Sequence, residues 1–371
     1  MSADKSSYAQ QESLVIGIDL GGTQIRAAVL RGAQIQARAA MLTGDDPAPE
    51  GVLSRIYTTI QQALDGANVT LDEVAGIGVS VPGPLNNRTG VIYTPPNLRA
   101  LHGISLRDVL REKYGGKPVC VENDANAAAL GEYRFGAGRG CENMVYLTVS
   151  TGIGGGVIVD GRILEGVNGT AGELGHMTVD WRGERCSCGN IGCLEALASG
   201  TAIARRANEA IASAQGVELL AFARTMLEHT TTVPDKRALP TQDLSTQPLD
   251  KTFSADPDDI PEGEFKMSAR TVARAAEAGI PVAREIITSA AEALGVGLVN
   301  ILHIFSPEVI ILGGGVVKMG SMLIEPALKI VQERTMRANL TEARIVLAQL
   351  GENAGLIGAG ALPAYYQQFE G

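Results

Sequence analysis

Runs of apolar residues that end in glycines recur along the chain. Residues 14–20, LVIGIDL, predict a buried strand, which the turn GGT joins to a second apolar run, IRAAVL. Residues 145–164, VYLTVSTGIGGGVIVDGRIL, repeat this order of apolar strand, small hydroxyl residues, glycines and apolar strand. Two such hairpins indicate two similarly built halves that face each other across a cleft.

Helix and strand patterns alternate through the rest of the sequence, which indicates an α/β fold. The predicted helices cover residues 51–64, 269–278, 282–305 and 355–362, and two more begin near Asp124 and Ala196. The helix at 282–305 is long and expected to be buried, and the helix at 355–362 has small faces that should pack tightly. The predicted strands lie at 76–81, at 309–312 and just before Asn123.

Two segments carry no sustained hydrophobic period. Residues 1–13 are mostly polar and are expected to form a disordered tail. Residues 225–266 contain five prolines, scattered acidic residues and threonines. We interpret this second segment as a flexible surface insertion.

The composition narrows the class of protein. The chain has 371 residues, 45% hydrophobic and 19% charged, which is typical of a globular protein with two domains. A net charge of −10 argues against a broad surface for nucleic acid. No uninterrupted apolar run reaches the length of a membrane span, and the N-terminus lacks a basic segment followed by an apolar one. We therefore expect a cytoplasmic protein with small-molecule ligands, without nucleic acid or membrane as partner.

Three of the five cysteines fall in one short segment. Cys186, Cys188 and Cys193 form a Cys3His set with His176, and these ligands suit a closed, tetrahedral, structural Zn²⁺ site. A disulfide is the alternative, but Cys186 and Cys188 are too close in sequence to pair easily, and nothing indicates secretion. Four protein ligands leave no open position for a catalytic water, which excludes a zinc-dependent hydrolase.

The glycine turns are candidate sites for phosphate and a metal ion. Asp19 ends the first strand, where its carboxylate could hold Mg²⁺ through water. A structural hairpin turn with an incidental aspartate is the alternative, but the second hairpin repeats the arrangement. The residues whose backbone N–H groups or hydroxyls could hold phosphate are Gly21, Gly22, Thr23, Thr151 and Gly152.

A third glycine cluster follows the strand predicted at 309–312. Gly314 and Gly315 suit a close approach to adenosine or its phosphates, although a simple turn between strand and helix is the alternative. The sequence contains no GxxxxGK[ST] segment, so a P-loop is excluded. Any nucleotide must be held by the hairpins.

Polar residues at strand ends supply the candidate chemistry. Asp124 lies near the start of a helix, whose dipole should lower its pKa and keep it an ionised acceptor; a helix cap is the alternative. Gly83, between two prolines, opens the backbone at another strand end, where ligands of α/β sheets often lie. Glu173 and Glu195 bracket the Cys3His set and could receive hydroxyl groups.

With these residues assembled, the chain resembles the ROK family (repressors, open reading frames and kinases), and among its members the bacterial glucokinases. The motifs are DLGGT at 19–23, VENDANAAALGE at 121–132, STGIGGG at 150–156, GELGH at 172–176, CSCGNIGCLE at 186–195 and ILGGGV at 311–316. The resemblance implies an actin-like, ribonuclease H-like kinase fold of two α/β domains with a cleft between them. Residues 14–122 with 355–371 would form the small domain, and 123–354, with the zinc motif at 176–193, the large one.

The resemblance also implies a reaction and its residues. The reaction is ATP-dependent phosphorylation of glucose to glucose 6-phosphate in a homodimer or homotetramer, with Asp124 as general base. Asn123, Glu173, His176 and Glu195 match sugar ligands, and His176 would bind zinc through one ring nitrogen and sugar through the other. Gly83 and Asn97 would complete the pocket. Glucokinases commonly carry a tryptophan shortly after the residue equivalent to Asn97, and this chain has Leu101-His102-Gly103 there instead.

Two other functions remain open on these residues. The pocket residues do not exclude a kinase for another hexose or aminohexose, such as N-acetylmannosamine, fructose or allose. A sugar-responsive repressor is expected to carry a helix-turn-helix domain before the first hairpin, and only about eighteen residues precede Asp19. We therefore expect a kinase.

Overall fold

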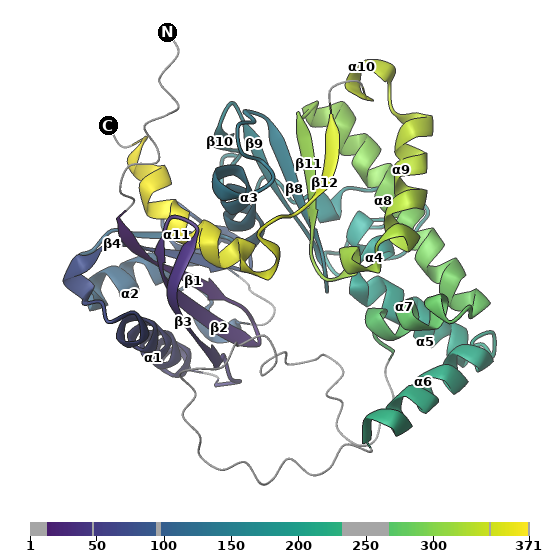
Figure 1. Cartoon of the computed structure of the whole chain (residues 1–371), viewed down its shortest axis with the longest axis horizontal. Helices are drawn as coiled ribbons and strands as arrows, with labels where there is room; N and C mark the ends of the chain where they lie inside the picture. The colour runs from purple at the N-terminus through teal and green to yellow at the C-terminus, as the bar shows by residue number, and fades with distance from the viewer. Residues whose placement is uncertain (1–12, 47, 94–97, 232–266, 341–342, 370–371) are drawn as a thin grey trace.

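The described chain forms two five-stranded sheets. Helices pack around both sheets (Figure 1). The computed structural model describes residues 13–46, 48–93, 98–231, 267–340 and 343–369. Residues 1–12 of the predicted tail and residues 232–266 of the predicted insertion lie outside this part of the chain. Helix α6 (Val217–Thr231) continues past residue 225, so the expected start of the insertion was wrong. The apolar stretch VELLAFA begins this helix just before residue 225, and the helix continues into that segment.

The first sheet has the strand order β3-β2-β1-β4-β7. Strands β1 and β2 form the predicted antiparallel hairpin, and β4 and β7 extend the sheet in parallel. The bounds are β1 Leu14–Leu20, β2 Gln24–Arg31, β3 Gln34–Leu42, β4 Val74–Val81 and β7 Val119–Asn123, with a small hairpin of β5 (Leu85–Asn86) and β6 (Val91–Ile92) after β4. Helices α1 (Pro49–Ala67) and α2 (Leu106–Lys113) contribute to one core with this sheet.

The second sheet repeats this plan in the order β10-β9-β8-β11-β12. An antiparallel hairpin of β8 and β9 again lies beside two parallel strands, so the prediction of two similarly built halves is confirmed. The bounds are β8 Met144–Val149, β9 Ile153–Val159, β10 Arg162–Ile163, β11 Val309–Gly313 and β12 Arg344–Leu347. The helices around it are α4 (Leu194–Ala198), α5 (Gly200–Ala212), α7 (Ala269–Glu277), α8 (Pro281–Phe305), α9 (Ser321–Arg334) and α10 (Arg337–Leu340).

Helix α8 forms the centre of the second core. By length and composition it could cross a membrane, but 61% of its most apolar window is buried inside the protein. Its side chains Ile287, Leu294 and Leu298 pack in one cluster with Val145 and Leu147 of β8. The predicted long buried helix is therefore confirmed, and its apolar character is explained by the core that it fills.

Two helices of small residues lie between the sheets. Helix α11 (Ala354–Gln367) packs on β1 and β4 of the first sheet, whereas α3 (Asp124–Phe135) packs on β8 and β9 of the second. The two helices also pack against each other (Figure 1). An added Cβ at Gly358 would overlap the carbonyl oxygen of Ala127, so only glycine permits this approach. The predicted small faces of α11 therefore bring α3 close to the first sheet.

We predict that Gly358→Ala lowers the free energy of unfolding by about 1–3 kcal/mol, the usual cost of overpacking. Helix propensity alone would give the opposite sign, because alanine favours a helix by about 1 kcal/mol over glycine. Gly355→Ala in the same helix is the control, since its Cβ would meet no atom closer than 3.5 Å. Denaturant unfolding measures both variants, and equal stabilities would contradict the close approach.

Candidate functional site

The carboxyl ends of three parallel strands place candidate residues at one edge of the first sheet. Asp19 at the end of β1 pairs in register with Ser80 of β4, and Val81 of β4 pairs with Asn123 of β7. The Ser80 hydroxyl donates to Oδ1 of Asp19 at 3.3 Å. Ligands of α/β sheets bind outside such strand ends. The structure therefore brings together residues that are far apart in the sequence.

Asn123 and Asp124 mark the junction between β7 and α3. Oδ1 of Asn123 accepts the N–H groups of Ala125 at 2.9 Å and of Asn126 at 3.4 Å, so Asn123 is the cap of α3. Asp124 is the first helical residue, and its Oδ1 accepts only the adjacent N–H of Ala125, at 2.8 Å. The alternative reading of Asp124 as the helix cap was therefore wrong. Its carboxylate keeps its second oxygen for another partner.

The pKa of Asp124 is raised, not lowered as the helix dipole alone predicts. Burial by the surrounding protein is the largest cause, and the negative charges of Asp19 and Glu173 add to it. The hydrogen bond from the Ala125 N–H opposes these effects, and the pKa reaches about 6. Solvent still reaches the side chain. A carboxylate with this pKa and this access is suited to accept a proton near neutral pH.

Gly83 lies beside both Asn123 and Glu173. A Cβ added at Gly83 would lie 2.9 Å from Nδ2 of Asn123 and 3.9 Å from Oε1 of Glu173. Burial raises the pKa of Glu173, and the nearby charge of Glu195 raises it further, whereas His176 lowers it. Gly83, Asn123 and Glu173 of the predicted pocket are therefore neighbours. A side chain at position 83 would fill the space beside Asn123 and Glu173, so the glycine keeps this space open.

Glu195 connects the pocket to the second hairpin. It lies in the first turn of α4, and its Oε2 accepts the N–H of Ile153 at 2.9 Å. A Cβ at Gly152 would lie 2.5 Å from the same oxygen. The predicted sugar-binding and phosphate-binding residues are therefore in contact at this point.

The Cys3His set forms a compact cluster. Nδ1 of His176 lies 3.6 Å from Sγ of Cys186, and the sulfur atoms of Cys188 and Cys193 lie 3.7 Å apart. All four ligand atoms lie within 4.8 Å of one another. Ligand atoms of a tetrahedral zinc ion with Zn–S bonds of about 2.3 Å are separated by roughly 3.5–3.8 Å. The residues therefore fit a zinc ion.

This cluster also determines where two pocket residues lie. Cys193 directly precedes α4, which carries Glu195, and Glu173 precedes a short 3-10 turn (Leu174–His176) that ends at His176. Gly192, at φ +70°, allows the chain to pass the Asp180 carbonyl, which a Cβ would overlap. A group bound to the four ligands would thus hold both carboxylates.

The glycine turns present unpaired backbone donors. In the described part of the chain, the N–H groups of Gly22, Thr23, Thr151 and Gly152 donate to no protein acceptor. Two turns of the same kind, one in each half, could therefore bind anionic oxygens. Gly314, at φ +94°, packs against Val149, the last residue of β8, so the third glycine cluster lies beside the second turn.

Arg26 is a residue that the sequence analysis missed. Its guanidinium forms an ion pair with Oδ2 of Asp19 and donates to the carbonyl of Glu352 at 3.0 Å. The signal was present, because Arg26 is the one charged residue in the apolar run IRAAVL. Asp19 therefore shares its carboxylate with a cation of the protein itself. Asn97, the remaining predicted pocket residue, lies outside the described residues.

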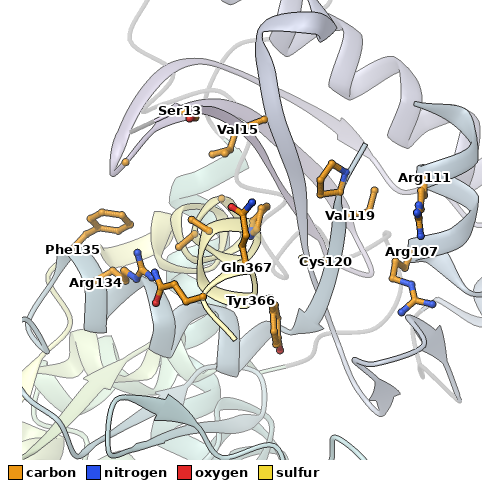
Figure 2. Close-up of a pocket in the computed structure, with 18 of the residues that line it drawn as sticks. Ser13, Val15, Arg107, Arg111, Val119, Cys120, Arg134, Phe135, Tyr366 and Gln367 are labelled. Atoms are coloured by element: carbon orange, nitrogen blue, oxygen red, sulfur yellow. The ribbon is translucent and has the colours of Figure 1, made fainter. Parts of the chain in front are cut away.

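A cavity in the described chain lies away from these residues. It measures about 830 Å³ and extends around the end of α11, between Arg107 and Arg111 of α2 and Arg134 at the end of α3 (Figure 2). None of the predicted site residues lines it. We therefore assign the candidate site from the converging side chains and not from the size of a cavity.

Comparisons with known proteins identify the family. The sequence profile of the ROK family matches residues 15–364. The chain is 34% identical to the glucokinase of Halalkalibacterium halodurans and 33% identical to that of Thermotoga maritima, each over 349 residues, covering 94% of this chain and 94% and 96% of those proteins. It is 30% identical over 351 residues to the xylose repressor of Caldicellulosiruptor bescii, covering 94% of this chain and 77% of the repressor.

Solved structures give the same result for the fold. The ROK hexokinase from Thermus thermophilus superposes with a TM-score of 0.72 at 34% identity, covering 96% of this chain and 100% of that one. A ROK family glucokinase from Streptomyces griseus, in complex with glucose and AMPPNP, gives 0.71 at 31% identity, covering 94% and 99%. The predicted actin-like two-domain kinase fold is therefore confirmed.

We predict that Asp124→Asn raises the melting temperature at pH 7.5, by on the order of 1–3 °C. The wild-type pKa of about 6 lies above the usual value of 3.8, so ionisation of Asp124 destabilises the folded state. The gain should shrink as pH falls through 6 and vanish below about 4, where both states bind the proton. Calorimetry at pH 4, 5.5 and 7.5 measures the difference in melting temperature between the variant and the wild type. A difference that does not change with pH would contradict the ionisation of Asp124 as its cause.

Proposed function

Because the chain belongs to the ROK family, we propose that it is a sugar kinase that transfers a phosphoryl group from ATP to the 6-hydroxyl of glucose. The observation that carries the proposal is the convergence of Asn123, Asp124 and Glu173 beside Gly83. Asp124 offers a proton acceptor, and Asn123 and Glu173 offer hydrogen-bond partners for hydroxyl groups. The 34% and 33% identity to two glucokinases supports the same substrate class.

Asp124 is the proposed general base. The carboxylate would accept the hydroxyl proton as the attacking oxygen bonds to phosphorus, with the leaving oxygen of ADP in line on the far side. A pKa of about 6 makes Asp124 mostly ionised at pH 7 and yet more basic than an ordinary aspartate. Burial near Asp19 and Glu173 thus raises its proton affinity without removing its charge.

Sugar selection is assigned to Asn123, Glu173, His176 and Glu195. The amide of Asn123 can still donate through Nδ2 while its Oδ1 caps α3. An analogue without a hydroxyl would leave one of these polar groups unpaired once the sugar covers it, which is the basis of strong discrimination. Zinc at the Cys3His set would act structurally, by fixing His176 through Nδ1 and leaving Nε2 for the sugar.

Phosphate binding is assigned to the two hairpin turns. The unpaired N–H groups of Gly22, Thr23, Thr151 and Gly152 fit the oxygens of ATP. Mg²⁺ would compensate phosphate charge near Asp19, whose other neighbours are Arg26 and Ser80. Gly314 and Gly315, beside the second turn, would accommodate the adenosine. We also propose the domain division at residues 14–122 with 355–371 and 123–354, and a homodimer, which sedimentation can test.

Two alternatives share the scaffold. The chain could act on another hexose or aminohexose, because the proposed pocket residues would bind hydroxyl groups that several sugars share. The 30% identity to a xylose repressor supports a sugar-responsive regulator without turnover as the second alternative. A coupled assay of ADP release with glucose, mannose, fructose, allose and N-acetylmannosamine separates them. Glucose should give the highest kcat/KM, and no ADP release with any sugar would favour the regulator.

We predict that Asp124→Asn lowers kcat by about two to four orders of magnitude while glucose binding changes little. The amide keeps the shape of the side chain but cannot accept the proton at neutral pH. Wild-type kcat should fall as pH drops through about 6, where Asp124 takes up a proton. A variant that keeps more than about a tenth of kcat would refute the role of base.

We predict that Cys188→Ser lowers zinc content, lowers the melting temperature and raises KM for sugar more than KM for ATP. The loss of one thiolate weakens the site that positions Glu173 and Glu195. Elemental analysis should find about one zinc per wild-type chain. Cys120→Ser is the control, because Cys120 lies outside the cluster. Wild-type enzyme without zinc, or unchanged sugar affinity in Cys188→Ser, would contradict this assignment.

A further inference from the structure

A buried carboxyl group lies directly behind the proposed base. Glu122, the residue before Asn123 in β7, has no exposed surface, although glutamate is an ionisable residue. Its Oε1 accepts the backbone N–H of Asn123 at 2.8 Å and Nδ2 of Asn126 at 3.1 Å. One carboxyl oxygen thus holds both the end of β7 and the first turn of α3, between which Asp124 lies.

The second oxygen of Glu122 continues into a chain of hydrogen bonds. Oε2 lies 2.5 Å from the hydroxyl of Tyr366 in α11, and that hydroxyl lies 2.9 Å from Oε1 of Glu165, which follows β10. Nδ2 of Asn87 also contacts Oε2, at 3.1 Å. Figure 2 shows Tyr366 beside the strand that carries Val119 and Cys120. The chain therefore joins the first sheet, α11 and the second half of the molecule.

The protons of this chain can be counted. A tyrosine hydroxyl donates one hydrogen bond, and two ionised carboxylates can only accept. Both short contacts of Tyr366 are therefore hydrogen bonds only if one carboxyl group carries a proton. Burial raises the pKa of Glu122, and no cation is among the groups bonded to it. Tyr366 therefore links Glu122 to Glu165 through the one proton that its hydroxyl donates and one proton carried by a carboxyl group.

We propose that Glu122, Tyr366 and Glu165 position Asn123 and Asp124 for catalysis, through the two hydrogen bonds that Glu122 accepts at the start of α3. Glu122 is a positioning residue, since it touches neither sugar nor phosphate in the assigned site. This inference rests on the proposed function of Asp124. It adds to that function a requirement for the buried carboxyl group behind the base and for its contact, through Tyr366 of α11, with the second half.

The first test compares Glu122→Ala with Glu122→Gln. The alanine variant loses both acceptors, and a small displacement of the base should lower kcat by about 10- to 100-fold, with KM for ATP within about twofold. Glutamine keeps Oε1 and is neutral, and its amide can donate to Tyr366. Asn87 has a buried Oδ1 without a partner, which can turn toward that amide. Glutamine should therefore recover most of the lost kcat.

A second pair of variants replaces a tyrosine by phenylalanine, which removes only a hydroxyl group and leaves no large buried cavity. Tyr366→Phe removes the hydroxyl between Glu122 and Glu165 and should lower kcat by about 3- to 10-fold. Tyr365→Phe is the matched control on the same helix, because the Tyr365 hydroxyl accepts the N–H of Ile163 at 2.7 Å and does not contact Glu122. It should lower the melting temperature and leave kcat unchanged. Equal kcat in the two variants would overturn the proposal.

Hydrogen exchange of residues 119–130 gives a readout that does not need turnover. The amides at the start of α3 should exchange faster in Glu122→Ala and in Tyr366→Phe than in the wild type and in Tyr365→Phe. Unchanged exchange, or a glutamine variant as slow in catalysis as the alanine variant, would overturn the positioning role. If the wild type phosphorylates no hexose, the proposed function is refuted. The exchange rates then decide by themselves whether Glu122 and Tyr366 hold the start of α3.

Discussion

The close contact between α3 and α11 is the constraint on which the candidate site depends. Helix α3 begins at Asp124 and packs on the second sheet, while α11 packs on the first. Glycines at positions 131 and 358 let the two helix backbones approach one another, because a Cβ at either position would meet a carbonyl oxygen or backbone of the other helix. The proposed base therefore lies where the two halves meet, and its position depends on packing well away from it.

Electrostatics at this junction work against stability. Asp19, Asp124 and Glu173 gather three carboxylates in one region, and burial together with the charges of the other two raises the pKa of Asp124. Arg26 and Ser80 both bind the carboxylate of Asp19. Such crowding of like charges is typical of functional sites, because the arrangement that raises proton affinity also costs folding free energy. The cation and the phosphates proposed here would relieve part of that cost on binding.

A hydrogen-bond network and the Cys3His cluster connect the elements around the proposed base. The cluster links the segment before α4 to the short turn after Glu173, and so connects two pocket carboxylates. Glu122 holds the start of α3 from the opposite side, through Asn123 and Asn126. The proposed base thus lies between two local supports, one of thiolates and imidazole and one of buried oxygens. Both draw residues from distant parts of the chain.

Local signals in the sequence were sufficient for much of this protein. The hairpin at residues 14–31, the long helix ending at Phe305 and the ligand set around Cys188 follow from apolar period, glycine turns and close spacing. These features depend on residues that are neighbours along the chain, so a linear pattern contains the information. The family motifs added the fold, which the structural neighbours confirm.

Tertiary structure decided the properties that arise from distant residues. The helix dipole at Asp124 can be predicted from local sequence, but its pKa follows burial and the charges of Asp19 and Glu173, which come from other strands and turns. The ion pair of Asp19 with Arg26 crosses a hairpin, and Glu122 bonds to Tyr366 from the last helix. Solvation and Coulomb energies depend on distance in space. A sequence without its fold does not contain those distances, so the charge state of the site could only be derived from the folded chain.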